Sequence, residues 1–293
     1  MPLVSAYLLP HGMQLIPGLD KKRFSKFEAL TKDFTTINKH IKKKSPDRVI
    51  LISPHGIALE ESFCILMNAN ARGYLPELND SNVDGVLIKE QLNIALDPDF
   101  SDDLFKYLKK NGIKVDSLVF GSKNFYSPIA WGEIVPLYFL QEFLLKVPGV
   151  IITLPQSRYD FAHFKPKLFE MGVKIGEFCQ NCPERVSLII SGDLSHKHQN
   201  ESIFGYHPDG KIFDNLINNW IAYPSEKSFL KQAQNLNISA ASCGISTLTI
   251  LDGIFDTYFR QNGCSWEGQL VNYAVPTYFG MALGIFEPNK HKD

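Results

Sequence analysis

The sequence predicts an α/β protein, a single domain in which helices wrap a mainly parallel central sheet. Short apolar runs without charges are typical of strands buried on both faces of such a sheet. Four such runs begin at Val4, Val49, Val150 and Val186. Segments with helical periodicity separate them, and this alternation favours parallel strands joined by helices. We find no internal repeat or linker, so we expect one domain over residues 1–288 and a disordered tail at 289–293.

The first two strands are predicted to end in the same tripeptide. Val4–Leu9 runs into Pro10-His11-Gly12, and Val49–Ser53 runs into Pro54-His55-Gly56. Between them, apolar residues recur at helical spacing over Lys21–Lys44 and predict a helix. Proline cannot donate a ladder hydrogen bond and glycine relaxes the backbone. Each strand should therefore stop there and place its histidine on a turn.

The middle of the chain predicts shorter elements. Phe63–Phe100 contains loop signals such as Leu78-Asn-Asp80 and Asp97-Pro98, which indicate short elements joined by loops. A helix is predicted over Asp102–Lys110 with Ser101 as its N-cap, because acids open it and lysines close it. The further predicted elements are a strand at Asp116–Phe120, a helix at Ile134–Leu145 with Pro136 in its first turn, a strand at Val150–Leu154 and a helix at Lys165–Cys179.

The last third begins with the segment Val186–His198, in which a buried strand ends at Gly192 and is followed by polar side chains. Helical periodicity then predicts three helices, at Asp209–Ala222, Glu226–Leu236 and Ser246–Phe259. Tyr278–Phe286 has the character of a strand, and we expect it to close the sheet.

The composition argues against several classes of protein. The chain has 293 residues, of which 44% are hydrophobic and 21% charged, with a net charge of −1. This balance is typical of an ordinary globular domain and argues against a nucleic-acid-binding surface. No apolar run reaches the ~20 residues of a membrane helix, and no basic segment opens a secretory signal, so we expect a cytoplasmic location. The five cysteines are scattered and odd in number, unlike a disulfide framework.

Histidines follow three of the predicted strands. Parallel strands end at one edge of a sheet, where α/β proteins bind their ligands. His11, His55 and His196 would then lie over one crevice, as a mononuclear metal site requires. Asp193 precedes His196 by three residues, close enough on a tight turn to orient the imidazole for proton transfer. A single histidine near a strand end is more often structural, so the hypothesis depends on three strands being neighbours.

A third metal ligand must come from elsewhere in the chain. Two imidazoles and one anionic ligand form the facial triad of non-haem iron oxygenases, which leaves positions open for substrate and oxygen. Cys243 stands just before the helix predicted from Ser246, where backbone amides and the helix dipole would lower the pKa of a thiol. As a thiolate it would supply the negative charge. The alternative is that Cys243 is a small buried apolar residue, as most cysteines outside disulfides are.

Seven short motifs occur in order along nearly the whole chain. They are Leu8-Leu-Pro-His11, Ile52-Ser-Pro-His55-Gly56, Val135-Pro-Leu-Tyr-Phe-Leu140, Ser191-Gly-Asp-Leu-Ser-His196, Gly205-Tyr-His-Pro-Asp-Gly210 with Phe213-Asp214, Cys243-Gly244 and Trp266-Glu-Gly268. Together they resemble the LigB superfamily, which contains the catalytic subunit of class III extradiol ring-cleavage dioxygenases, the MEMO proteins, and a LigB-like module often fused to an AMMECR domain. The resemblance implies a LigB/MEMO-like α/β fold, and we expect no AMMECR segment after this one module.

The resemblance also implies roles for individual residues. His11 and His55 match the two histidine ligands of ferrous iron in the dioxygenases and the two metal histidines of MEMO proteins. His196 matches the acid/base that acts on the substrate hydroxyl and dioxygen. The dioxygenases take their third ligand from a glutamate, whereas MEMO proteins use a cysteine, which Cys243 matches. The implied cofactor is one divalent metal ion, Fe(II) first, with Mn, Zn or Cu as alternatives.

Two positions depart from the dioxygenase pattern. Ser242 stands where fused relatives often have the glutamate of Glu-Cys-Gly, and Trp131 replaces the histidine of an Asp-His-Gly motif. A serine hydroxyl cannot replace the charge of a carboxylate. Glu267 is a carboxylate that could compensate, although we expect it, like Ser242 and Trp131, to lie beside the ligands rather than to bind the metal.

Two functions are consistent with these residues. The first is a metal-dependent dioxygenase-like enzyme that opens the ring of a small catechol with Fe(II) and dioxygen, with His196 and Asp193 handling protons. The second is a MEMO-like metal-binding or regulatory module that works with AMMECR-type and radical S-adenosylmethionine partners. The retained His196 favours the first, whereas Ser242 and Trp131 favour the second. Neither needs a nucleic acid or a membrane, and a homo-oligomer is compatible with both.

Overall fold

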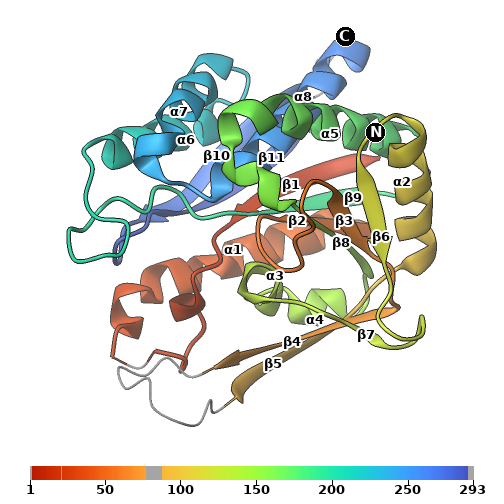
Figure 1. Cartoon of the computed structure of the whole chain (residues 1–293), viewed down its shortest axis with the longest axis horizontal. Helices are drawn as coiled ribbons and strands as arrows, with labels where there is room; N and C mark the ends of the chain where they lie inside the picture. The colour runs from red at the N-terminus through yellow and green to blue at the C-terminus, as the bar shows by residue number, and fades with distance from the viewer. Residues whose placement is uncertain (1, 21, 77–87, 290–293) are drawn as a thin grey trace.

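A central sheet organises the part of the chain that the structure, a computed structural model, describes: residues 2–20, 22–76 and 88–289. Within these residues, eight strands lie in the order β10-β11-β1-β9-β2-β8-β3-β6 (Figure 1). Their bounds are β1 Leu3–Leu9, β2 Arg48–Ser53, β3 Phe63–Leu66, β6 Val115–Leu118, β8 Gly149–Thr153, β9 Val186–Ser191, β10 Ser265–Ala274 and β11 Met281–Asn289. The central neighbours β1, β9, β2 and β8 are parallel, which confirms the predicted α/β class.

Helices cover both faces of this sheet. Successive residues of a strand point to opposite faces, so each strand contributes side chains to two hydrophobic cores. Leu8 of β1 packs with one hydrophobic core and the adjacent Leu9 with the other. One core contains side chains of α2 (Pro98–Lys110), α5 (Phe161–Asn181), α6 (Asp209–Ala222), α7 (Lys227–Ala240) and α8 (Gly244–Asn262). The other contains α1 (Glu28–Lys44), α3 (Trp131–Tyr138) and α4 (Gln141–Leu144). Within the described ranges, no helix has the length and apolar character that crossing a membrane requires.

A second, three-stranded sheet was not predicted. It consists of β5 (Ile88–Ala95), β4 (Asn70–Pro76) and β7 (Tyr126–Pro128), with β4 in the middle. Asparagine, glycine and proline in β4 resemble loop signals, but its buried and exposed residues alternate as in a strand with one covered face. The loop expected at Leu78–Asp80 lies outside the described residues.

The end of the chain corrects two expectations. Tyr278–Phe286 was expected to close the sheet, but the strand here, β11, lies between β1 and β10 and is antiparallel to both. The outermost strand on this side of the sheet is β10, which was not predicted because most of its residues are polar or partly exposed. Asn289 pairs with Ser265 in the sheet and is therefore not part of a disordered tail; residues 290–293 lie outside the described part.

Helix starts were predicted less accurately than helix positions. The helix expected from Lys21 begins at Glu28, and Lys21 itself is not described. Asp97, not Ser101, caps α2: its carboxylate accepts from the backbone N–H groups of Asp99 and Phe100 at 3.2 and 3.0 Å. Asp97-Pro98 was interpreted as a loop, although a capping acid followed by proline also begins helices. The other predicted helices and strands are present with ends shifted by a few residues, except Ile134–Leu145, which is two helices.

Pro136 leaves one backbone carbonyl of α3 without its helical donor. Pro136 was expected in a first helical turn, but it lies at the sixth residue of α3. Proline has no N–H to give to the carbonyl four residues earlier, which weakens the helix around it. That carbonyl belongs to Gly132, and it finds another donor beside the histidines described below.

Candidate metal centre

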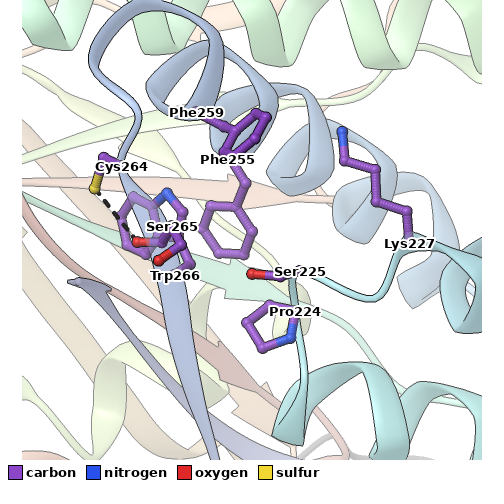
Figure 2. Close-up of a pocket in the computed structure, with 8 residues that line it drawn as sticks. All are labelled: Pro224, Ser225, Lys227, Phe255, Phe259, Cys264, Ser265 and Trp266. Carbon is purple, nitrogen blue, oxygen red and sulfur yellow. Dashed lines mark hydrogen bonds between the residues drawn. The ribbon is translucent and has the colours of Figure 1, made fainter. Parts of the chain in front are cut away.

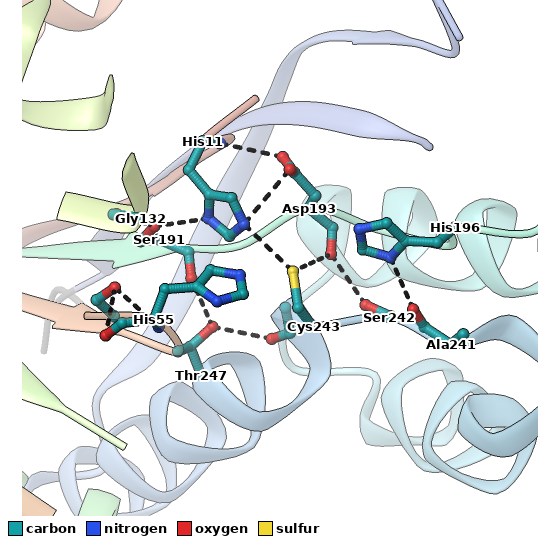
Figure 3. Close-up of polar contacts among 12 residues, drawn as sticks. His11, His55, Gly132, Ser191, Asp193, His196, Ala241, Ser242, Cys243 and Thr247 are labelled. Atoms are coloured by element: carbon teal, nitrogen blue, oxygen red, sulfur yellow. Dashed lines mark hydrogen bonds and ion pairs between the residues drawn. The ribbon is translucent and has the colours of Figure 1, made fainter. Parts of the chain in front are cut away.

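Three parallel strands deliver polar side chains to one edge of the sheet. His11 follows β1, Asp193 follows β9 and His55 follows β2, and β9 pairs with both β1 and β2. The rings of His11 and His55 meet edge to face, with centroids 4.6 Å apart (Figure 3). The predicted neighbourhood of these strands is therefore confirmed, and the carboxyl ends of the sheet form the site.

Cys243 reaches the histidines because α8 begins directly against the end of β9. A Cβ atom on Gly192 would lie 2.7 Å from the Cα of Gly244, so only glycine allows this approach. Cys243 precedes the helix, and its Sγ lies 3.3 Å from Nε2 of His11. Next to it, the hydroxyl of Ser242 donates to the carbonyl oxygen of Asp193 at 3.0 Å. Ser242 thus connects the start of α8 to the end of β9, beside the candidate ligands.

The donor atoms are close enough to share one ion. One ligand atom each from His11, His55 and Cys243 lie within 4.8 Å of one another, as do those of Asp193, His196 and Cys243. Two imidazoles and a sulfur suit zinc, copper or iron, and a carboxylate lies beside them as a further anionic donor. The residues therefore fit a single divalent cation.

A relay of hydrogen bonds orients His11 for binding a cation. The Gly132 carbonyl, which Pro136 leaves without a helical donor, accepts the hydroxyl proton of Ser191 at 2.5 Å. Because Ser191 donates there, its oxygen must accept from Nδ1–H of His11 at 2.8 Å. Nε2 is then left with its lone pair, and it faces Cys243. Histidine ligands typically donate their other N–H in this way, which fixes the tautomer.

Burial keeps both imidazoles neutral, as metal ligands must be. It holds the pKa of His11 well below its usual range, and nearby His55 and His196 act in the same direction. Burial also lowers the pKa of His55 to about 4, with smaller contributions from the charges of Arg158 and His196. Protons therefore compete weakly with a cation for these two nitrogens near neutral pH.

The expected pKa of Cys243 is wrong for this structure. The sulfur does stand at the beginning of a helix, but burial raises the thiol pKa far above its ordinary value, and the charge of Asp193 adds to the effect. Desolvation outweighs the helix amides because protein surrounds most of the side chain, although part of it lines the pocket described below. The thiolate that a metal site needs would be formed by the cation itself.

Asp193 accepts its hydrogen bond from His11 and not from His196. Its Oδ1 accepts from the backbone N–H of His11 at 3.0 Å, and its Oδ2 lies 3.4 Å from Nε2 of the same residue. We expected it to orient His196, but within the described residues no hydrogen bond joins the carboxylate to that ring, although an oxygen of Asp193 and a nitrogen of His196 lie within 4.8 Å of each other (Figure 3). Burial raises the pKa of Asp193 to about 7, so it can gain or lose a proton near neutral pH.

His196 is held by the backbone instead. Its Nδ1 lies 2.7 Å from the carbonyl oxygen of Ala241, which can only accept, so Nδ1 carries the proton. The other nitrogen, Nε2, is free to act as a base and points toward the site (Figure 3). Burial lowers the pKa of His196, which keeps this nitrogen unprotonated, and Phe279 stacks on the ring at 5.7 Å.

A buried network that the sequence analysis missed anchors the loop carrying His196. Asp214 of α6 is fully buried and accepts from the backbone N–H of Ser195 at 2.8 Å. Its other oxygen accepts from Nε2 of His198 and from the hydroxyl of Tyr273, each at 2.8 Å. The motif Phe213-Asp214 was the signal for it. Because sequence separation hides the partners, its role could not be assigned in advance.

The site opens into a pocket of about 470 Å³. His55, His196, Cys243, Arg158, Phe161 and Phe204 are among the residues that line it. At one side, Trp131 lies against His55 with ring centroids 4.8 Å apart and is 42% exposed. The indole therefore lies beside a predicted ligand. Arg158 was not predicted, although it follows β8, a strand that ends at the same edge.

Glu267 does not belong to this site. It lies on β10 opposite Glu287 of β11, toward the end of the sheet where β1 begins, and its carboxylate accepts from Asn289 at 2.5 Å. Its neighbour Trp266 lines a separate apolar pocket of about 90 Å³ with Phe255 and Cys264 (Figure 2). The expectation that Glu267 lies beside the ligands is wrong, because it depended on sequence order and not on strand direction.

Fold and site together define a class: an α/β protein with a candidate centre for one divalent metal ion at the carboxyl ends of parallel strands. A family model described as the catalytic LigB subunit of aromatic ring-opening dioxygenase matches residues 5–283. The chain therefore belongs to the LigB family, as its motifs indicated.

Two similar proteins add context. Protein CA_C1420 of Clostridium acetobutylicum is 24% identical over 291 residues, which cover 98% of this chain. This chain spans only 58% of the length of that relative. A crystal structure of the uncharacterized protein JW3007 from Escherichia coli K12 matches with a TM-score of 0.58 and 14% identity. It covers 96% of this chain and 99% of its own, and it supports the fold alone.

Proposed function

We propose that this protein is a metal-dependent extradiol-type dioxygenase that opens the ring of a small catechol with Fe(II) and dioxygen. The observation that carries the proposal is the convergence of His11, His55 and Cys243, with the free nitrogen of His196 facing the same point. Two neutral imidazoles and one anionic donor leave coordination positions for a bidentate diol and for oxygen. Membership of the LigB family supports the same class of reaction.

The proposed reaction needs no further reductant. One carbon–carbon bond beside the diol breaks, and both atoms of dioxygen enter the product, so the substrate supplies all the electrons. His11, His55 and Cys243 would hold the cation, which when bound would supply Lewis-acid and redox chemistry to the catechol and dioxygen. Nε2 of His196 accepts a proton from a catechol hydroxyl, because its other nitrogen is tied to Ala241. Asp193, with a pKa raised to about 7, is a second group able to hold a proton there.

The pocket suits a substrate with one aromatic ring. Its volume of about 470 Å³ lies within the range of small-molecule sites. Phe161 and Phe204 line it beside His55 and His196, so apolar walls stand next to the polar floor. Such walls exclude water from the reacting atoms, which strengthens every electrostatic interaction at the centre.

Ring opening in the reconstituted protein tests the proposal. Apoprotein is loaded anaerobically with Fe(II), mixed with a panel of catechols and exposed to oxygen, and the yellow ring-fission product is followed by absorbance. We expect His196→Gln to keep the metal and to lose about 10²- to 10⁴-fold in turnover. His207→Gln is the matched control, since the side-chain contacts described for this half-exposed imidazole are with Asp209, the first residue of α6. A protein that binds iron and opens no ring in the panel would refute a dioxygenase.

A second candidate function is a MEMO-like metal-binding or regulatory module, and the presence of Cys243 in the ligand set favours it. Trp131 supports it as well, because an indole beside His55 cannot transfer protons as an imidazole can. This module would act with AMMECR-type and radical S-adenosylmethionine proteins. Metal binding and partner binding without turnover of any catechol would establish it, and steady ring cleavage would exclude it.

A further inference from the structure

The outermost strand β10 leaves one side of its backbone without a partner among the described residues. Its other side pairs with β11 from Ser265 to Ala274. In an antiparallel strand, about half of the N–H and C=O groups point away from the neighbouring strand. Within the described ranges, no backbone group outside β11 bonds to those of β10. This edge can therefore accept a further strand, as open sheet edges do in complexes with extended peptides.

A groove of about 600 Å³ lies beside this edge. One wall is the connection between α6 and α7, from Ala222 to Glu226, and the other contains Trp266, Glu267 and Gly268 of β10. Consecutive residues of a strand point to opposite faces, so the feature that three residues in a row share is their backbone. The groove therefore follows the unpaired edge, and an extended segment lying in it would reach the free N–H and C=O groups.

The regular part of the edge is short. The register of β10 and β11 shifts between Leu270 and Asn272, where a bulge interrupts the ladder. The stretch Ser265–Leu270 contains one charged residue, Glu267, and neither proline nor lysine, the residues that commonly protect edges from pairing. We therefore expect a docked segment to pair over Ser265–Leu270 and to end near the bulge.

An apolar pocket adjoins the groove and has room for one side chain. Groove and pocket share Pro224, Ser225 and Trp266. The pocket holds about 90 Å³, far below the roughly 300 Å³ or more of small-molecule sites. Pro224 and Trp266 lie on opposite sides of it (Figure 2). Phe259 also lines it and is 58% exposed, so the pocket opens at the surface, and an apolar side chain entering it would extend the core.

The groove carries negative charge without a cationic partner in the described residues. Glu226 and Glu267 line it and are exposed. Their carboxylates accept hydrogen bonds from neutral N–H groups. Lys227 lines the adjoining pocket, but its ammonium group pairs with Asp256 at 2.5 Å. A segment that carries lysine or arginine would complement the two glutamates.

We propose that this groove binds an extended segment of a partner protein. The segment adds a strand to β10 and places one apolar side chain in the adjoining pocket, with lysine or arginine on either side. Backbone pairing supplies affinity, and the side-chain pocket supplies specificity. A second copy of this chain fits less well, because pairing β10 with itself would gather Glu226 and Glu267 of both copies in one interface.

The groove lies toward the end of the sheet where β1 begins, away from the candidate metal centre. The inference is therefore independent of the proposed function. Binding here needs no metal, and the experiments below are carried out on the full chain without added metal.

Binding of synthetic peptides tests the proposal. The probes are short fluorescein-labelled threonine peptides with a central leucine, valine, methionine or phenylalanine between two lysines or two glutamates, followed by fluorescence anisotropy. We expect saturable binding of a lysine-flanked peptide and weaker binding of its glutamate-flanked counterpart. Aspartate at the central position should weaken binding about 10- to 100-fold, because the buried apolar side chain is lost. No saturation by any lysine-flanked peptide at concentrations on the order of 1 mM would overturn the proposal.

Two N-methylated analogues of the tightest peptide distinguish strand pairing from apolar contact alone. One is methylated at both lysines, and the other at the central residue and at the threonine two positions after it. Alternate amides of a strand point to the same side, so only one of these sets faces β10. One analogue should lose about 10-fold or more in affinity, and the other should bind nearly as well as the parent. Equal losses in both, or a loss in neither, would contradict strand addition.

Phe259→Asp and Glu267→Lys locate the binding site, and both replace exposed side chains. Phe259→Asp should weaken the lysine-flanked peptide about 10-fold or more. Glu267→Lys should weaken it about 2- to 5-fold and strengthen the glutamate-flanked peptide. Glu142→Lys is the matched control, because this exposed glutamate of α4 also has a polar partner, Lys42, but lies outside the groove. Unchanged binding in Phe259→Asp, or equal effects of the two glutamate variants, would overturn the assignment.

The oligomeric state of the peptide-free protein decides between a partner protein and a second copy. We expect Phe259→Asp and Glu267→Lys to sediment at equilibrium as the unmodified protein does. If either variant shifts the protein to a smaller species, the edge of β10 pairs with a second copy and the partner proposal is wrong. If Phe259→Asp does not fold, Glu267→Lys and the methylated peptides still decide the question.

Discussion

Two cysteines of this protein line pockets at opposite ends of the sheet, and their surroundings differ. Cys243 lies beyond the carboxyl ends of β1, β9 and β2, where Nε2 of His11 is 3.3 Å from its sulfur. Cys264 lies just before β10, toward the end where β1 begins, and donates to the carbonyls of Ser265 and Asn289. Both cysteines lie among aromatic rings, but only the first lies among imidazoles.

The difference shows that strand direction decides which cysteine lies among side chains that can bind a metal or transfer protons. Parallel strands end together at the edge occupied by Cys243, and the loops after them carry the histidines and Asp193. At the opposite ends of the strands, Phe255 stacks on Trp266 with ring centroids 4.3 Å apart, and none of the described residues that line the pocket is a histidine (Figure 2). We therefore interpret the Cys264 pocket as part of the core and the Cys243 pocket as the site.

Removing one imidazole from the Cys243 pocket is expected to have the largest effect. His11→Ala should lower the affinity for Fe(II) or Zn(II) on the order of a thousandfold, because one of three ligands is lost from a site typically worth about 10 kcal/mol or more. Metal analysis and competition with a chelator would measure it. His40→Ala is the control. This partly buried histidine lies away from the site, and its Nδ1 is 2.9 Å from the hydroxyl oxygen of Tyr7. Equal affinity in both variants would contradict the ligand assignment.

A substitution in the Cys264 pocket should lower the stability of the fold and leave metal binding unchanged. Phe255 is 5% exposed and packs on Trp266, so Phe255→Ala should lower the free energy of unfolding by about 3 kcal/mol through the cavity that it leaves. Metal stoichiometry of the folded protein should not change. Phe259, which lines the same pocket but is 58% exposed, provides the control, with a loss of about 0.5 kcal/mol or less. Denaturant unfolding measures both, and a loss of metal in Phe255→Ala would break the comparison.

Much of the difference between the Cys243 and Cys264 pockets could be predicted from the sequence, because it depends on where the strands end. The tripeptides around His11 and His55 stop their strands, and charge-free apolar runs indicate a parallel sheet, so the meeting of the two rings followed from local patterns. The place of Cys243 at the beginning of a helix was also predictable. Its pKa was not, because burial depends on the packing of Gly192 against Gly244, which no local pattern reveals.

What the sequence could not predict are the partners of polar groups. The spacing of Asp193 and His196 placed them on one turn, but side-chain direction sends the carboxylate to His11 and leaves His196 to a carbonyl. Glu267 was misplaced for a related reason: β10 is polar enough to hide its strand character, so its direction was unknown. Contacts between distant elements decide these details, and Arg158 became apparent only once the pocket was formed.

The smallest expected effect concerns the relay of hydrogen bonds that orients His11. It is tested by comparing two serines of the same strand. Ser191→Ala removes the oxygen that accepts from Nδ1 of His11 and donates to Gly132. Loss of such an orienting partner typically lowers metal affinity by about 10- to 100-fold. Ser187, on the same strand, pairs with Ser5 at 2.7 Å, and Ser187→Ala removes a buried hydroxyl of the same kind away from the ligands.

Both serine variants should lose about 1 kcal/mol of stability, since each breaks a buried hydrogen bond. Only Ser191→Ala should also weaken the metal, because only that hydroxyl fixes which nitrogen of His11 keeps its lone pair. Metal titrations of the two folded variants, compared with their unfolding curves, separate orientation from general destabilisation. If both bind the metal equally well, the histidine tautomer is set by the cation alone, and the link from Pro136 through Gly132 to His11 has no part in binding.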